Sequence, residues 1–165
     1  MRRLHAALLL LTATLLGCDQ ATKAAAQATL GPASATHSVG LIDGVVELKY
    51  EQNPDTAFSL LRTFGIAHGA WLMLALSSFA LAAVITIWIA SRKRLTTHHH
   101  IGFALVLAGA LGNVLDRAVH TYVIDFIHVT RWPIFNVADI AVVLGILLLA
   151  FARGRPRPAI AGSAV

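Results

Sequence analysis

The chain has 165 residues, of which 57% are hydrophobic and 13% charged, and its formal net charge is +5. This apolar fraction exceeds that of an ordinary soluble domain and predicts an integral membrane protein. A single cysteine, Cys18, excludes an internal disulfide framework and a multi-cysteine metal site, and no basic stripe interleaved with aromatic residues indicates nucleic-acid binding.

Four segments are long and apolar enough to cross a bilayer, whose core of ~30 Å takes roughly 20 helical residues. They span residues 4–28, 66–90, 101–119 and 135–152. The sequence therefore predicts a single-domain, all-α membrane protein built as a four-transmembrane-helix bundle.

The first span has a rival interpretation. The stretch "MRRLHAALLLLTATLLGC" also resembles a secretory signal with a lipobox, which would make Cys18 a lipidated N-terminus. The helical pattern, however, continues through "DQATKAAAQATL" to the break at Gly31 and Pro32, and three further spans follow. We therefore expect a membrane helix in which Cys18 is unmodified and takes part in helix packing.

Residues 31–65 are the only sizeable soluble segment between the predicted spans. Within it, "VELKY" (46–50) alternates apolar and polar residues, which is the period of a half-buried strand. We expect a small extracytoplasmic β-sheet subdomain there.

Charge predicts the orientation of the spans. Basic residues cluster at the start of the chain, in the loop 92–94 and in the tail 153–165, whereas all eight acidic residues lie toward the opposite side. By the positive-inside rule we expect both termini and the tail in the cytoplasm, with the tail disordered. His98, His99 and His100 fall in the same cytoplasmic loop, where we expect them to be solvated and not to bind a metal.

Three spans carry an aspartate at a similar depth. Counting ~1.5 Å per residue from the cytoplasmic boundaries places Asp19, Asp116 and Asp139 about 21 to 24 Å into the membrane. In a core of ~30 Å this layer is shielded, yet shallow enough for water to reach. On the third span Gly109 and Gly112 share a helical stripe with Asn113 and Asp116, so this stripe should face the bundle interior.

Two carboxyl groups in one layer can hydrolyse a peptide bond. At a few ångströms they share one proton, so one member can take a proton from water while the other polarises a carbonyl group. No serine or cysteine has an obvious histidine partner at this level. The alternatives are an ion pair, with Arg117 or another helix as the partner of Asp116, and a proton-coupled transporter. A transporter predicts polar residues across the whole membrane, whereas the inner halves of the spans are nearly all apolar.

Five motifs follow one another along the chain: "DQATK" (19–23), "NPDTAFSLL" (53–61), "GALGNVLDR" (109–117), "VIDFI" (123–127) and "FNVADIAVVLG" (135–145). Jointly they resemble signal peptidase II, the family of bacterial lipoprotein signal peptidases, which are four-span intramembrane aspartyl proteases. The resemblance implies that Asp116 and Asp139 are the catalytic dyad. It also implies that seven residues support the site or bind substrate: Asp19, Lys23, Asn53, Asn113, Arg117, Asp125 and Asn136.

The resemblance implies the substrate and the location too. The substrate is a prolipoprotein with a diacylglyceryl group on its lipobox cysteine, and the cut falls just before that cysteine. We expect a monomer in the bacterial inner membrane, in contact with lipid, with its active site near the extracytoplasmic face and with no cofactor or metal. Two positions depart from the family pattern, because Asp55 and Ala108 stand where glycine is usual. An inactive, substrate-binding homologue is the remaining alternative.

Overall fold

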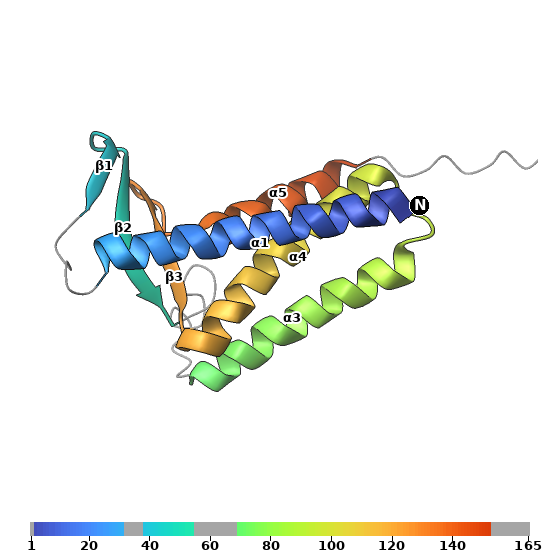
Figure 1. The fold of residues 1–165 in the computed structure, drawn as a ribbon, viewed down its shortest axis with the longest axis horizontal. Helices are drawn as coiled ribbons and strands as arrows, with labels where there is room; N and C mark the ends of the chain where they lie inside the picture. Colours follow the sequence, from blue (N-terminus) through green and yellow to red (C-terminus); the bar gives the residue numbers. More distant parts are fainter. Residues whose placement is uncertain (1, 32–37, 55–68, 153–165) are drawn as a thin grey trace, which may run out of the picture.

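The computed structural model describes residues 2–31, 38–54 and 69–152. Within these residues, helices and a three-stranded antiparallel sheet make up the fold. The helices are α1 (Arg2–Leu30), α3 (Ala70–Ser91), α4 (Thr97–His120) and α5 (Val137–Phe151). The strands are β1 (Val39–Ile42), β2 (Val46–Asn53) and β3 (Val123–Val129). The sheet lies at the end of the helical bundle away from the N-terminus (Figure 1), so the predicted bundle with a small sheet is confirmed.

The described helices have the exterior of a membrane protein. α1, α3 and α4 are long and apolar enough to cross a bilayer, and α5 is a shorter apolar helix of 15 residues. Large side chains such as Leu9, Trp71, Phe79 and Phe151 are exposed on their surfaces. Lipid chains can cover such side chains at no cost, whereas water cannot.

Two local predictions from the sequence are wrong. Cys18 is exposed on α1 and so does not pack between helices, because the helix turns its polar face, not this residue, toward the bundle. The run of three histidines lies in the first turn of α4 rather than in a loop. Thr96 and His99 form a capping box, so the helix starts at Thr97 and not at the predicted residue 101. His100 accepts a hydrogen bond from Nε1 of Trp88 at 3.0 Å.

α4 is the central helix and packs against α1, α3 and α5. Its glycines allow close approach, as the predicted stripe requires. A Cβ atom on Gly112 would lie 2.6 Å from Oδ2 of Asp19 in α1, and one on Gly109 would overlap the carbonyl oxygen of Ala138 in α5. The polar residues of three helices therefore meet at short range in the bundle interior.

The sheet carries further polar residues to this end of the bundle. β2 contains the predicted "VELKY" strand and pairs with both β1 and β3. β3 was not predicted as a strand; it starts directly after α4, which ends at the left-handed Thr121 (φ 67°). In the β2–β3 register Asn53 lies opposite Val123, and Glu51 opposite Asp125. This register brings Asn53, the last residue of the central strand β2, next to Asp125 in β3.

The packing of α4 on α5 is testable through its glycines. Ala138 meets Gly109 with backbone atoms, which cannot rotate away, so Gly109→Ala has to push the two helices apart. We expect it to lower the free energy of unfolding by about 1–3 kcal/mol, measured as a lower thermal midpoint in detergent. Gly17→Ala is the control, because Gly17 in α1 has open space around it, and alanine there should be neutral or up to about 1 kcal/mol stabilising. Equal midpoints for the two variants would contradict the close packing.

Candidate active site

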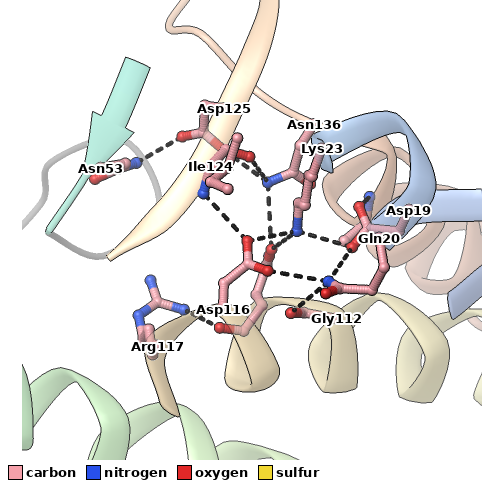
Figure 2. Close-up of polar contacts among 12 residues, drawn as sticks. Asp19, Gln20, Lys23, Asn53, Gly112, Asp116, Arg117, Ile124, Asp125 and Asn136 are labelled. Atoms are coloured by element: carbon pink, nitrogen blue, oxygen red, sulfur yellow. Dashed lines mark hydrogen bonds and ion pairs between the residues drawn. The ribbon is translucent and has the colours of Figure 1, made fainter. Parts of the chain in front are cut away.

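Lys23 is the centre of a buried polar cluster. Its Nζ atom lies 2.8 Å from Oδ2 of Asp19 and 2.9 Å from Oδ2 of Asp116, and it donates to Oδ1 of Asn113 at 3.1 Å (Figure 2). The residue is only 1% exposed. An ammonium group has three hydrogens, so these three contacts use its full donor capacity. The alternative of an ion pair between Asp116 and another helix is thus what the structure contains.

The two carboxylates paired with Lys23 also bind backbone amides of other elements. Oδ1 of Asp19 accepts the N–H of Ala138 in the first turn of α5 at 2.9 Å. Oδ2 of Asp116 accepts the N–H of Ile124 in β3 at 3.1 Å. The N–H groups in the first turn of a helix, such as that of Ala138, have no partner within their own helix. Asp19 of α1 therefore caps the N-terminus of α5.

Gln20 belongs to the same cluster, although the sequence did not single it out. Its Nε2 atom donates to Oδ2 of Asp19 at 3.2 Å and to Oδ1 of Asp116 at 3.0 Å, and lies 3.5 Å from the carbonyl oxygen of Gly112. One feature of the sequence could have indicated Gln20. It follows Asp19 within a predicted membrane span, where a side-chain amide needs polar partners.

The start of α5 holds Asp139. Asn136 is the N-cap residue, and its side chain accepts the N–H of Asp139 at 3.0 Å while Oδ2 of Asp139 accepts the N–H of Asn136 at 3.2 Å. This reciprocal pair is a capping box, which fixes the carboxyl group at the first turn. Oδ1 of Asp139 accepts Nδ2 of Asn113 at 2.9 Å. Asp139 is half-buried, so it remains partly accessible.

Lys23 decides which way the Asn113 amide points. An ammonium group can only donate, so the Asn113 atom that it meets must be the oxygen. Nδ2 of Asn136 donates to the same oxygen at 3.2 Å. The Asn113 amide nitrogen is therefore directed at Asp139, which links Lys23 to that carboxyl group through one side chain.

Asp125 is held by two neutral amides. Nδ2 of Asn53 donates to its Oδ2 at 2.9 Å, and Nδ2 of Asn136 donates to its Oδ1 at 2.7 Å (Figure 2). Burial raises the pKa of Asp125 to about 7, and the negative charge of Asp139 also raises it, while the hydrogen bonds from Asn53 and Asn136 act in the opposite direction. Asp139 thus acts on Asp125, and the two share Asn136 as a partner.

Most of the predicted site residues come together in this cluster. Lys23 links Asp19, Asp116 and Asn113. Asn136 links Asn113 to both Asp125 and Asp139, and Asn53 binds Asp125 from the end of β2. Arg117 lies at the border of the cluster, where its Nη1 donates to the backbone oxygen of Asn113 at 3.4 Å (Figure 2).

Asp55 and Ala108 are the two positions at which the sequence departs from the family pattern. Ala108 is 1% exposed and packs inside the bundle, whereas Asp55 lies outside the described residues. Within residues 2–31, 38–54 and 69–152, no three His, Cys, Asp or Glu side chains are arranged to hold a metal ion.

The raised pKa of Asp125 predicts how stability depends on pH. An unfolded aspartate titrates near 3.8 and the folded one near 7. Between these values only the folded state binds the proton, so the free energy of unfolding falls as pH rises from about 4 to about 7 and is unaffected by this group above that.

We therefore expect the thermal midpoint in detergent to fall more between about pH 5 and pH 8 in the wild type than in Asp125→Asn, which has no proton to lose. The other titrating groups are the same in both proteins, so the difference between the two pH dependences reports Asp125 alone. Parallel pH dependences would show that Asp125 does not titrate in this window.

The chain is similar in sequence to known peptidases over most of its length. A family model described as signal peptidase (SPase) II matches residues 11–153. A lipoprotein signal peptidase of Pelotomaculum thermopropionicum is 36% identical over 145 residues, which are 88% of this chain and 90% of the relative. Those of Thermosynechococcus vestitus (36%; 86% and 87% covered) and Xanthomonas oryzae pv. oryzae (35%; 86% and 85% covered) are similar to a comparable extent.

Two solved structures of bacterial membrane enzymes, both obtained by the in meso method, have the same fold. One gives a TM-score of 0.73 at 24% identity and covers 87% of this chain and 85% of the solved chain. The other gives 0.74 at 23% identity and covers 88% and 90%. The arrangement of helices and sheet is thus shared with experimentally determined membrane proteins.

Proposed function

The chain belongs to the signal peptidase II family, and from this premise we propose that it is a membrane aspartic endopeptidase that removes signal peptides from prolipoproteins. Two carboxyl groups that share Asn136 as a partner, one in β3 and one in the first turn of α5, support this activity. The proton-coupled transporter considered as an alternative is not favoured, since the relatives similar over 85% or more of this chain are peptidases by name.

The shared partner Asn136 is the observation that carries the choice of catalytic residues. Its backbone N–H binds Asp139 and its side-chain amide binds Asp125, at 3.2 and 2.7 Å. Two carboxyl groups on either side of one residue can bind one water molecule between them. We therefore propose Asp125 and Asp139 as the catalytic pair.

The sequence had paired Asp139 with Asp116 instead. Three donors already bind Asp116: Lys23 Nζ, Gln20 Nε2 and the N–H of Ile124. A catalytic carboxyl group must gain and lose a proton in each cycle, and Asp116 could not do so without breaking its ion pair with Lys23. Asp125 meets neutral amides and has a pKa of about 7, which suits proton transfer at neutral pH.

The reaction then needs no covalent intermediate. Asp139, as carboxylate, takes a proton from the water while the water oxygen attacks the carbonyl carbon of the scissile bond, and Asp125 gives its proton to the carbonyl oxygen. In the second half, Asp139 gives its proton to the leaving nitrogen and Asp125 recovers one from the tetrahedral carbon's hydroxyl group. The C–N bond breaks, and both aspartates return to their starting states.

The finer properties of substrate and location follow the family. The substrate is a prolipoprotein whose lipobox cysteine carries a diacylglyceryl group, and the bond before that cysteine is cut. The protein lies as a monomer in the bacterial inner membrane with both termini in the cytoplasm. The sheet lies at the end of the bundle where α4 ends and α5 begins (Figure 1). Asp125 in β3 and Asp139 in the first turn of α5 belong to these elements, which supports a site near the extracytoplasmic face, where a signal peptide in the membrane exposes its C-terminal end.

Substitution of each aspartate by asparagine separates the two possible pairs. We expect Asp125→Asn and Asp139→Asn to lower kcat at least about 1,000-fold on a fluorogenic peptide with a diacylglyceryl-cysteine lipobox, because each removes a proton-transfer group. Asp116→Asn should lower stability, because it leaves the Lys23 ammonium with one fewer anion, yet retain measurable turnover. Full turnover by Asp125→Asn together with an inactive, folded Asp116→Asn would restore the pair predicted from sequence.

The pH dependence of the reaction is a second test. Because kcat/KM reports the protonation states of the free enzyme, it should fall as pH rises through about 7, when Asp125 loses the proton that it must donate. The measurement is the initial rate at low substrate concentration across about pH 5 to pH 9. A kcat/KM that stayed level from about pH 6 to pH 9 would remove Asp125 from the role of acid.

A further inference from the structure

β3 is tied to α4 directly beside one proposed catalytic residue. Oδ2 of Asp116 accepts the N–H of Ile124 at 3.1 Å, and Ile124 immediately precedes Asp125. Asp116 and Ile124 are both buried, at 2% exposure each. The position of the Asp116 carboxylate therefore sets where the backbone that carries Asp125 lies.

α5 is tied to α1 in the same way beside the other proposed catalytic residue. Oδ1 of Asp19 accepts the N–H of Ala138 at 2.9 Å, and Ala138 immediately precedes Asp139. Both residues are 1% exposed. Each proposed catalytic carboxyl group thus lies one residue beyond a backbone N–H that binds a carboxylate of a different element, Asp116 of α4 for Asp125 and Asp19 of α1 for Asp139.

Gln20 and Lys23 join these two anchoring carboxylates, Asp19 and Asp116. Lys23 brings one positive charge for two negative ones, so repulsion between the carboxylates is only partly compensated. The Gln20 amide donates one hydrogen to each, at 3.2 and 3.0 Å, and adds no charge (Figure 2). Gln20 is therefore a second link, beside Lys23, between Asp19 of α1 and Asp116 of α4.

We propose that Gln20 is a positioning residue: by bridging Asp19 and Asp116 it fixes the separation of Asp125 and Asp139. This inference rests on the proposed function, because it takes those two aspartates as the reacting pair. The separation matters because it determines how the pair shares a proton and whether one water fits between them. A misplacement of about 1 Å at a reacting centre can cost about 100-fold in rate.

Two substitutions and one matched control test the bridge. Gln20→Leu removes the donors with an apolar side chain that suits a membrane helix, and Gln20→Glu keeps the size and shape but replaces the donating amide with a third carboxylate. Gln27→Leu is the control, because Gln27 lies exposed on the same helix. All three are purified as intact protein and assayed on the diacylglyceryl-cysteine peptide, with the thermal midpoint measured alongside.

We expect both Gln20 variants to lose about 10-fold or more in kcat, with KM changed less than about twofold. The pH at which kcat is half-maximal should shift by about half a unit, because a changed separation alters how the two carboxyl groups share their proton. Gln27→Leu should match the wild type in kcat, KM and pH profile. A purely structural role would lower the thermal midpoint without moving the pH profile of the folded enzyme.

Wild-type kcat and pH profile in Gln20→Glu would overturn the proposal, since that variant lacks the donors but keeps the shape. So would a Gln20→Leu enzyme that loses only stability. Failure of the proposed function gives a different pattern, in which Asp125→Asn remains active whatever Gln20 does. Inactive Asp125→Asn and Asp139→Asn together with unaffected Gln20 variants would refute the positioning role alone.

Discussion

The site depends on one buried ammonium group placed between two carboxylates. Lys23 lies within 2.9 Å of both Asp19 and Asp116, and all three are almost fully buried. Isolated charges in a low-dielectric interior cost several kcal/mol each, so such a cluster persists only when its members are paired and hydrogen-bonded. The pairing joins α1 to α4, and the same two carboxylates also accept backbone N–H groups of α5 and β3.

The polar residues divide into two layers with different tasks. The charged layer of Asp19, Asp116 and Lys23 is saturated with partners and serves to hold backbone elements. The second layer, Asp125 and Asp139, is held by neutral amides. Neutral donors orient a carboxyl group without fixing its charge, so this layer can exchange protons while the first remains unchanged. Under the proposed function, stability and chemistry therefore depend on different aspartates.

Glycine makes this arrangement possible. The α4 glycines let α1 and α5 approach so closely that polar side chains of both helices contact those of α4. A single methyl group at Gly109 would overlap backbone atoms of α5. Membrane helices have no hydrophobic force to draw them together, so close packing and interhelical hydrogen bonds determine their spacing. The bundle and the site consequently depend on the same contacts.

The sequence by itself determined the class, the helices and the "VELKY" strand, because hydropathy and residue patterns along the chain are one-dimensional properties. Only the tertiary structure decided which carboxyl groups lie together, since that depends on helix rotation, on the turn after Thr121 and on the β2–β3 register. Asp125 illustrates the limit. It lies outside the predicted spans, so counting residues along a membrane helix could not place it with the other aspartates. In the structure, β3 brings it into contact with Asn136. Gln20 was missed because its significance comes from Asp116, 96 residues away in the chain.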